Sequence, residues 1–190
     1  MKITETIVGT CNEDSSTYLA PMGVWEEDSC TVLAPFKPSQ TLDNLKRTPY
    51  AVINRTDDVR IFAGCLSGHR KWPLINAEHV VAKRLAVALS HIEVEVVKVK
   101  DDAIRPRLYA KIIHEATHAP FGGFNRAQAA VIELAILVSR LDRLPADKVL
   151  TEIDYLKIAV DKTAGAKELE AWSWLMERVQ KKLRLDTNAL

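Results

Sequence analysis

The segment "HIEVEVVKVK", residues 91–100, contains the clearest strand in this chain. Apart from the pair Val96 and Val97, apolar residues alternate with polar and charged ones, which is the pattern of a strand with one buried and one solvated face. Turn residues follow at 101–106, and residues 107–116 then form a second β-rich run. This arrangement predicts an antiparallel hairpin.

The chain before this hairpin also has mostly a β pattern. Runs rich in β-branched and aromatic residues are separated by short clusters of turn residues. The predicted strands are residues 2–11, 17–26, 30–36, 50–55 and 59–65. Residues 41–47 predict a short helix with Leu42 and Leu45 on one side, and residues 67–76 predict a loop. Residues 77–89 are ambiguous, and their local pattern favours a helix.

The spacing of apolar residues changes from two to three and four after the segment "HAPFGGFN", which ends at Asn125. A helix is predicted from Asn125, its N-cap, to Leu144, and a second from Pro145 to Gly165. The apolar spacing of the following residues predicts a third helix that includes Trp172.

Strands followed by helices predict an α+β fold with segregated layers, and many short strands with tight turns suggest a small closed or half-open barrel. We expect a β-barrel domain over residues 1–119. A three-helix region over residues 120–190 would pack on the barrel.

The charge balance excludes several partners. The chain has 26 Lys and Arg residues against 25 Asp and Glu residues, so its net charge of +1 gives no attraction to nucleic acids or anionic membranes. The longest apolar run, residues 129–138, contains Glu133 and is too short to span a bilayer. Cys11, Cys30 and Cys65 are widely spaced in apolar surroundings, which predicts reduced thiols and a cytoplasmic protein.

The segment "HEATH", residues 114–118, has the H-E-x-x-H spacing of zinc peptidases. That chemistry requires both histidines on one face of a helix, with the glutamate beside a zinc-bound water. Here the preceding residues alternate as a strand, and "PFGG" at 120–123 stops any helix within a turn. We therefore expect no metal. The alternative, a zinc hydrolase, predicts bound zinc that is lost in His114→Ala.

The segment "PFKPSQTLDNLKRT", residues 35–48, places hydroxyl side chains at the start of the short helix. Ser39 and Thr41 lie where free backbone N–H groups and the positive end of the helix dipole point to one spot. Lys37 adds an ammonium group from the end of the preceding strand. Either Ser39 only caps its helix, or the group binds a phosphate.

Four long segments together resemble the domain-of-unknown-function 447 family. They are "ETIVGTCNEDSSTYLAPMGV" (5–24), "LAPFKPSQTLDNLKRT" (33–48), "INRTDDVRIFA" (53–63) and "PFGGFNRAQAAVIELAILVSRL" (120–141). The resemblance extends into the C-terminal helices. It implies an FMN-binding split β-barrel related to flavin reductases and pyridoxamine-phosphate oxidases. It also implies a homodimer with the non-covalently bound flavin at the subunit interface.

The resemblance further implies which residues contact FMN. The 35–48 segment would meet the phosphate, the backbone around Gly23 would run beside the isoalloxazine ring, and the polar end of the first strand would reach the ring's polar edge. A glycine suits the close approach of a flat ring to a strand. Residues of the "FGGFNRA" motif would contact flavin, substrate or the partner subunit. The implied positions are Thr10, Asn12, Met22, Gly23, Lys37, Ser39, Thr41, Asn44, Asn125 and Arg126.

The function implied by the resemblance is that of an FMN-dependent oxidoreductase or flavin reductase acting on a small substrate with a reduced electron donor. The flavin would carry the redox chemistry, which explains why the sequence has no catalytic motif. The alternative is a non-catalytic dimer that stores, senses or delivers FMN. Cys11, Cys30, His114 and His118 depart from the family's pattern, so the substrate pocket stays undefined.

Overall fold

The computed structural model describes residues 1–187, and this part of the chain divides into two compact units. The first unit contains residues 1–57 and 72–121, and the second contains residues 58–71 and the chain from Gly122 onward. Each unit has a hydrophobic core of its own. None of the helices in the described part is both long and apolar enough to cross a lipid bilayer.

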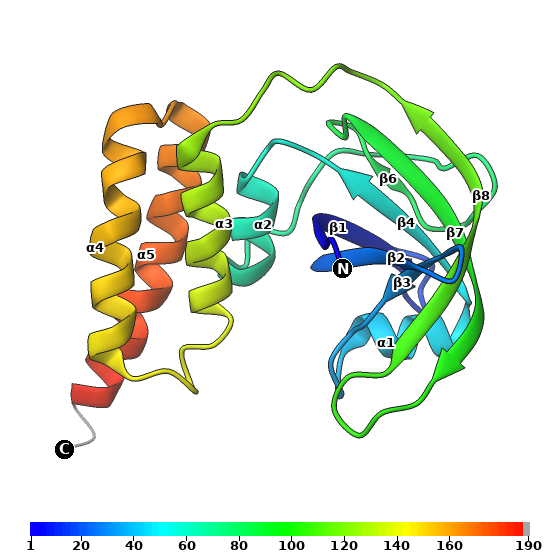
Figure 1. Ribbon diagram of the computed structural model, residues 1–190, viewed down its shortest axis with the longest axis horizontal. Helices are drawn as coiled ribbons and strands as arrows, with labels where there is room; N and C mark the ends of the chain where they lie inside the picture. The colour runs from blue at the N-terminus through cyan, green and yellow to red at the C-terminus, as the bar shows by residue number, and fades with distance from the viewer. Residues whose placement is uncertain (188–190) are drawn as a thin grey trace. The chain divides into compact units, whose positions relative to one another are not determined.

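Within the described residues, six antiparallel strands of the first unit close into a β-barrel (Figure 1). They are β1 (Thr4–Cys11), β2 (Thr17–Glu27), β3 (Cys30–Leu33), β4 (Tyr50–Arg55), β7 (Ser90–Lys100) and β8 (Arg107–Thr117). Their order around the barrel is β1-β2-β3-β8-β7-β4, and the pairing of β4 with β1 closes the ring. The predicted hairpin is confirmed as β7 and β8, which pair from Lys100 and Arg107 onward.

The alternation in β7 separates the inside of the barrel from its outside. Ile92 and Val94 belong to the apolar core, so His91 and Glu93 point to the outer face of the sheet. The other strand residues of this core are Val8, Met22, Val24, Leu33, Ala51, Ile53, Leu108 and Ala110. Burial of each large apolar side chain contributes roughly 1.5–3 kcal/mol to folding.

A short helix, α1 (Gln40–Arg47), lies at one end of the barrel (Figure 1). Its side chains Leu42 and Leu45 are 3% exposed and complete the core of the strands, which confirms the predicted short helix. On its other side, Arg47 Nη2 donates a hydrogen bond of 2.6 Å to the carbonyl of Cys11 at the end of β1. The helix is therefore fixed to the barrel by both apolar and polar contacts.

Residues 76–89, here called the outer loop, cover part of the outer face of the barrel. Val80 and Ala82 of the loop pack on Val52 of β4. The loop contains β6 (Arg84–Leu85), which pairs with β5 (Leu74–Ile75) in a small sheet. The prediction that 77–89 forms a helix is wrong. The N–H groups of Lys83 and Leu85, which a helix would pair with its own carbonyls, are bound instead by Thr17 and Asn54 of the barrel.

The second unit consists of helices in the described residues. They are α2 (Arg60–Ser67), α3 (Arg126–Val138), α4 (Ala146–Thr163) and α5 (Ala166–Thr187). Their shared core includes Ala63 from α2, Leu134 from α3, Ile153 from α4 and Leu175 from α5. The predicted α+β class, a barrel followed by three C-terminal helices, is confirmed.

The prediction of a strand at residues 59–65 is wrong, because this segment forms α2. Ile61 to Cys65 are all buried, so the run shows neither helical nor strand alternation and its period could not decide between the two. Two local signals favour the helix. Asp58 Oδ1 accepts a hydrogen bond from the Arg60 N–H, and Gly68, at a φ of 98°, ends the helix in a left-handed conformation.

The predicted N-cap of α3 is confirmed at Asn125. Its Oδ1 accepts hydrogen bonds from the N–H groups of Ala127 and Gln128, at 2.8 and 3.1 Å. The helix ends at Val138, earlier than predicted. Beyond it the Ser139 hydroxyl donates a 2.7 Å hydrogen bond to the Ile136 carbonyl, a local bond that competes with helical pairing.

Asp58 holds α2 against α5 through a buried carboxylate. Arg60 binds it through two nitrogens at 2.7 and 2.9 Å and also reaches Glu170 of α5 at 3.1 Å, while Lys167 of α5 lies 3.3 Å from the carboxylate. Burial opposes ionisation of Asp58, but Arg60 and Lys167 outweigh it and lower the pKa of Asp58 below its ordinary value. The carboxylate is therefore ionised at neutral pH.

Asp58→Asn should destabilise the helical unit by about 1–3 kcal/mol at pH 7, because Arg60 loses its buried partner. A depressed pKa stabilises the fold above the unfolded value of about 4, and this stability is lost as the pH falls through the folded value. The variant should therefore show a flatter fall in stability below about pH 4. Denaturant unfolding followed by circular dichroism measures both effects.

Asp142→Asn is the matched control, since Asp142 is 87% exposed in its pair with Lys182. That change should alter stability by no more than about 0.5 kcal/mol. Equal losses in the two variants would contradict the role given to Asp58.

Candidate functional site

Five polar side chains join in one hydrogen-bond network at the end of the barrel that carries α1: Thr10 of β1, Asn12 just after β1, and Gln40, Asn44 and Arg47 of α1. Asn44 Nδ2 donates to Thr10 Oγ1 at 3.0 Å and to Asn12 Oδ1 at 2.9 Å. Its Oδ1 accepts from Gln40 Nε2 at 2.9 Å and from Arg47 Nη2 at 3.1 Å. These four bonds use both hydrogens and both lone pairs of the Asn44 amide. Asn44 is thus a positioning residue that fixes Thr10 and Asn12.

The start of α1 has the features of an anion site. Ser39 is the N-cap, and its Oγ accepts a long hydrogen bond of 3.4 Å from the Leu42 N–H. Because Oγ is the acceptor in this bond, the cap does not use the hydroxyl hydrogen. The N–H groups of Gln40 and Thr41 belong to the first turn, where helices leave backbone donors unpaired by their own carbonyls. Thr41 itself is buried, at 3% exposure.

Lys37 lies at the same helix start but is engaged by another group. Its Nζ pairs with Asp101 in the turn between β7 and β8, and its N–H donates to the Ile104 carbonyl at 2.8 Å. Asp101 is 81% exposed, so this ion pair is solvated and contributes little stability. A bound dianion would compete with Asp101 for the ammonium group.

Met22 and Gly23 lie farther along the same pair of strands. Thr6 pairs with Met22 and donates its hydroxyl to the Met22 carbonyl at 2.8 Å. Thr6 and Thr10 are four residues apart on β1, so the two groups are separated by about 13 Å. A Cβ on Gly23 would lie 2.6 Å from Ile3 Cγ2, which shows that Gly23 makes room for this neighbour.

Asn125 and Arg126 belong to the helical unit. Asn125 uses its side chain to cap α3, and its Nδ2 also donates to the Thr163 carbonyl at the end of α4, at 3.0 Å. Arg126 is exposed. The structure therefore brings Thr10, Asn12 and Asn44 together. Ser39 and Thr41 lie at the start of the helix that contains Asn44. Asn125 is used instead to join the start of α3 to the end of α4.

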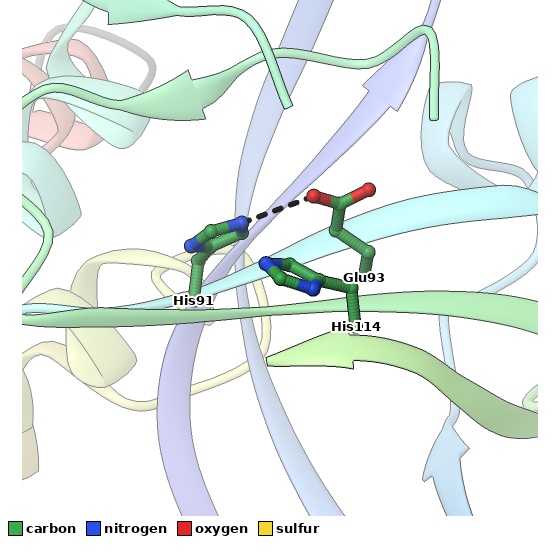
Figure 2. A group of neighbouring side chains, drawn as sticks. All are labelled: His91, Glu93 and His114. Carbon is green, nitrogen blue, oxygen red and sulfur yellow. Dashed lines mark hydrogen bonds and ion pairs between the residues drawn. The ribbon is translucent and has the colours of Figure 1, made fainter. Parts of the chain in front are cut away.

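A second polar group, which the sequence did not predict, lies on the outer face of the barrel (Figure 2). His91 and Glu93 project from β7, and His114 projects from the opposite position of β8. One ligand atom from each of the three lies within 4.8 Å of the others. His114 belongs to the "HEATH" segment. This segment lies at the end of β8, which confirms the predicted strand and excludes the helix that a zinc peptidase would need. Its Glu115 points elsewhere and pairs with Arg55.

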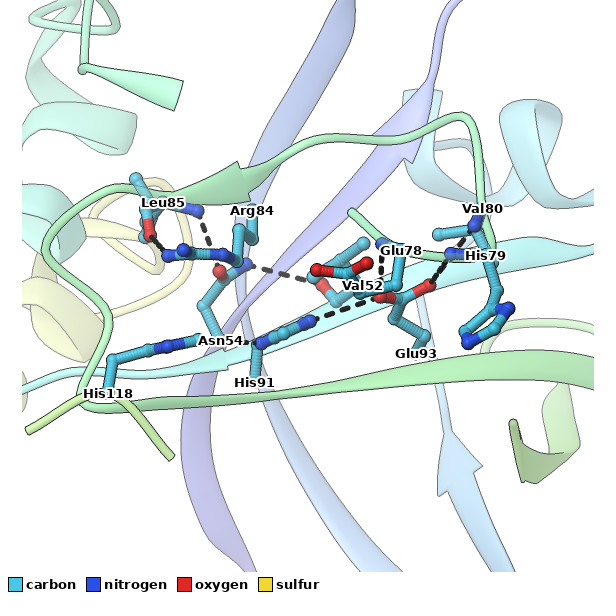
Figure 3. A network of polar contacts seen from close by, with 10 residues as sticks. All are labelled: Val52, Asn54, Glu78, His79, Val80, Arg84, Leu85, His91, Glu93 and His118. Carbon is cyan, nitrogen blue, oxygen red and sulfur yellow. Dashed lines mark hydrogen bonds and ion pairs between the residues drawn. The ribbon is translucent and has the colours of Figure 1, made fainter. Parts of the chain in front are cut away.

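Glu93 binds the outer loop with both carboxylate oxygens (Figure 3). Oε1 accepts from the Glu78 N–H at 2.7 Å, and Oε2 accepts from those of His79 and Val80 at 2.7 and 3.1 Å. Burial alone would raise the pKa of Glu93, but these backbone bonds, with a bond from His91, hold it below its ordinary value. The group is therefore an ionised carboxylate in a site that is 0% exposed.

His91 links Glu93 to His118. Its Nε2 lies 3.1 Å from Glu93 Oε1, and its Nδ1 lies 2.9 Å from His118 Nε2 (Figure 3). The rings of His91 and His118 stack at a centroid distance of 5.0 Å. Partial desolvation, with Arg84 nearby, lowers the pKa of His118, which favours its neutral imidazole.

Asn44→Ala should lower the free energy of unfolding by about 1–3 kcal/mol, because the buried Thr10 hydroxyl and Asn12 lose their donor. Denaturant titration measures this cost. Lys46→Ala, an exposed position of the same helix, is the control and should change stability by less than about 0.5 kcal/mol. A loss in Asn44→Ala no larger than in the control would show that the network carries no stability.

Comparison with solved structures supports the description of the fold. The FMN-bound protein MM1853 from Methanosarcina mazei, a DUF447 protein, superposes with a TM-score of 0.80 at 18% identity, covering 93% of this chain and 94% of its own. Flavoredoxin from Methanosarcina acetivorans gives a TM-score of 0.53 at 14% identity, with 61% and 69% covered. For the 2-nitrobenzoate 2-nitroreductase NbaA of Pseudomonas fluorescens, the TM-score is 0.53 at 18% identity, with 60% and 64% covered.

These similarities confirm the split-barrel fold. No curated protein matches the sequence. Residues 4–119 match the N-terminal domain described as "Protein of unknown function (DUF447)", and residues 125–177 match the C-terminal domain of the same name. Because the two matches together cover most of the sequence, the chain belongs to the DUF447 family.

Proposed function

We propose that this chain is a flavoprotein that binds FMN without a covalent link. The observation that carries the proposal is the similarity, over 93% of the chain, to a DUF447 protein whose structure is FMN-bound. The network at the start of α1 gives it chemical support, since a helix N-terminus beside hydroxyl groups and a lysine suits a phosphate.

The residues of this chain divide the tasks of holding FMN. The phosphate would accept hydrogen bonds from the Ser39 hydroxyl and from the first N–H groups of α1, including that of Thr41. Lys37 would exchange Asp101 for the phosphate. Asn44 would lie near the phosphate and hold its neighbours in place without a hydrogen bond of its own to the ligand, since its amide has no bonding capacity left.

The flavin ring would lie along β1 and β2. Thr10 and Asn12 are proposed at its polar edge, and the backbone of Met22 and Gly23 beside its plane, where the Ile3 side chain would have to give way. Arg126, exposed next to the Asn125 cap, is proposed to contact flavin, substrate or a partner subunit. FMN when bound supplies hydride or single-electron transfer, and the protein orients it and excludes water.

We further propose that the flavoprotein is an oxidoreductase of the flavin-reductase kind, acting on a small substrate. This rests on relatives of the same fold, among them a nitroreductase. The second candidate is a non-catalytic carrier or sensor of FMN. Consumption of a reduced nicotinamide or deazaflavin by the FMN-loaded protein distinguishes the two, since a carrier binds flavin and consumes no reductant.

A homodimer is proposed because β7 and β8 carry exposed apolar side chains. Val97, Val99, Ile112 and Ile113 are 47%, 58%, 50% and 41% exposed, a concentration that favours burial against a second copy. The proposed location is the cytoplasm, since the cysteines, all in the described part, are free thiols.

The visible absorption spectrum of the freshly purified protein tests the proposal directly. We expect a flavin spectrum, with FMN in the supernatant after heat denaturation. The double variant Lys37→Ala, Ser39→Ala should bind FMN at least about 10-fold more weakly, because it loses charge-assisted contacts to the phosphate. Fluorescence titration of the flavin measures the affinity, and Lys46→Ala is the control.

A colourless protein that also fails to bind added FMN would reject the flavoprotein proposal. Unchanged affinity in the double variant, with wild-type affinity in Lys46→Ala, would reject only the assignment of the phosphate site.

Sedimentation velocity tests the dimer. The wild-type chain should sediment as a dimer, and Val97→Glu with Val99→Glu should yield monomers, because buried glutamates would oppose association. Val87→Glu is the control, since Val87 is 42% exposed in the outer loop and outside the proposed interface. A monomeric wild-type protein at micromolar concentration would contradict this prediction.

A further inference from the structure

The polar group on the outer face of the barrel concentrates most of the histidines of this chain. The sequence has five, and His79, His91, His114 and His118 lie together here, while His69 stacks on Trp174 in the helical unit. We propose that His91, Glu93 and His114 form a binding site for a divalent transition-metal ion, with Zn²⁺ as the best match to two imidazoles and one carboxylate.

The distances suit a single ion. His91 Nε2 and Glu93 Oε1 are 3.1 Å apart, and all three ligand atoms lie within 4.8 Å of one another. Zinc binds such atoms at about 2.0–2.2 Å, so two ligands of a tetrahedral ion lie roughly 3.4 Å apart. Small side-chain rotations would therefore bring the three atoms around one ion. Figure 2 shows the His114 ring directed toward the other two side chains.

The groups behind these ligands match the support that metal ligands need. Metal-binding carboxylates and imidazoles are usually held by further hydrogen bonds. Glu93 is fixed by three backbone N–H groups of the outer loop, and His91 has His118 at its second nitrogen, 2.9 Å away. The burial of His91 and Glu93, at 1% and 0% exposure, also removes water that would compete for the ion.

The contacts of the His91 ring allow the change of tautomer that ion binding at its Nε2 requires. His91 contacts Glu93 through Nε2 and His118 through Nδ1, and its tautomer decides which nitrogen carries the hydrogen. With an ion on Nε2, His91 carries its hydrogen on Nδ1 and donates it to His118 Nε2, which then accepts. The change that ion binding needs in this pair is thus one of tautomer, and the His118 ring lies within hydrogen-bond distance to accommodate it.

The site differs from the one expected of an H-E-x-x-H zinc peptidase. The ligands come from two strands and not from one helix, and Glu115 is turned toward Arg55. His79, whose ring centre is 5.2 Å from that of His114, supplies a further imidazole from the outer loop. The geometry points to an ion that fastens this loop to β7 and β8.

Zinc titration of the full-length protein, freed of metal by a chelator, tests the proposal. We expect one equivalent of Zn²⁺ bound with a Kd below about 1 µM in competition with a chromophoric chelator. His114→Ala should weaken binding by more than about 100-fold, and His118→Gln by about 10–100-fold, because His118 acts through His91. His69→Ala should bind as the wild type does.

Thermal unfolding with and without zinc provides a second readout. Zinc should raise the unfolding midpoint of the wild-type and His69→Ala proteins but not that of His114→Ala, whose midpoint without zinc reports whether it folds. FMN binding should be the same in all variants, which separates this site from the proposed flavin site. Wild-type binding weaker than about 1 µM, or equal affinity in His114→Ala and His69→Ala, would overturn the proposal.

Discussion

The pairing of β1 with β4 is the constraint on which the first unit depends. It joins the two ends of a six-stranded sheet, so every described strand of the barrel has neighbours on both sides. Closure also decides which side of each strand faces the core. Thr10 and Asn12, at the end of β1, can meet Asn44 only because α1 lies against that closed end.

Two buried polar side chains of the barrel fix the outer loop against its outer face. Asn54 of β4 accepts a hydrogen bond from the Leu85 N–H at 2.8 Å and donates to the Ile7 carbonyl, and Glu93 of β7 binds three further N–H groups. A buried polar group without partners costs about 1–3 kcal/mol, so each of these side chains stabilises the loop and is in turn stabilised by it. The outer loop is thus fixed mainly by side chains of the barrel and not by regular pairing of its own.

The sequence predicted most of the strands and the last three helices, because their apolar residues repeat with a clear period. It failed where burial removes the period, as in α2, and where side chains replace backbone partners, as for the N–H groups of Lys83 and Leu85 in 77–89. These failures share one cause, since local patterns carry no information about contacts made across the fold.

The candidate sites follow the same division. The capping role of Ser39 and Asn125 was readable locally, whereas the ion pair of Lys37 with Asp101 joins residues far apart in sequence. The His91 and Glu93 group had a readable signal: they share a strand face, and simple pairing outward from the 101–106 turn sets Glu93 opposite His114. Two register shifts interrupt that hairpin, and the second cancels the first.

The way Glu93 holds the outer loop has a consequence for how this surface can vary. The carboxylate binds backbone N–H groups, which every residue except proline provides. The exposed side chains of Glu78 and Val81 can therefore be exchanged without loss of these hydrogen bonds. Substitutions at these exposed positions could therefore change the chemistry of this surface while the backbone of the loop and the barrel beneath it stay the same.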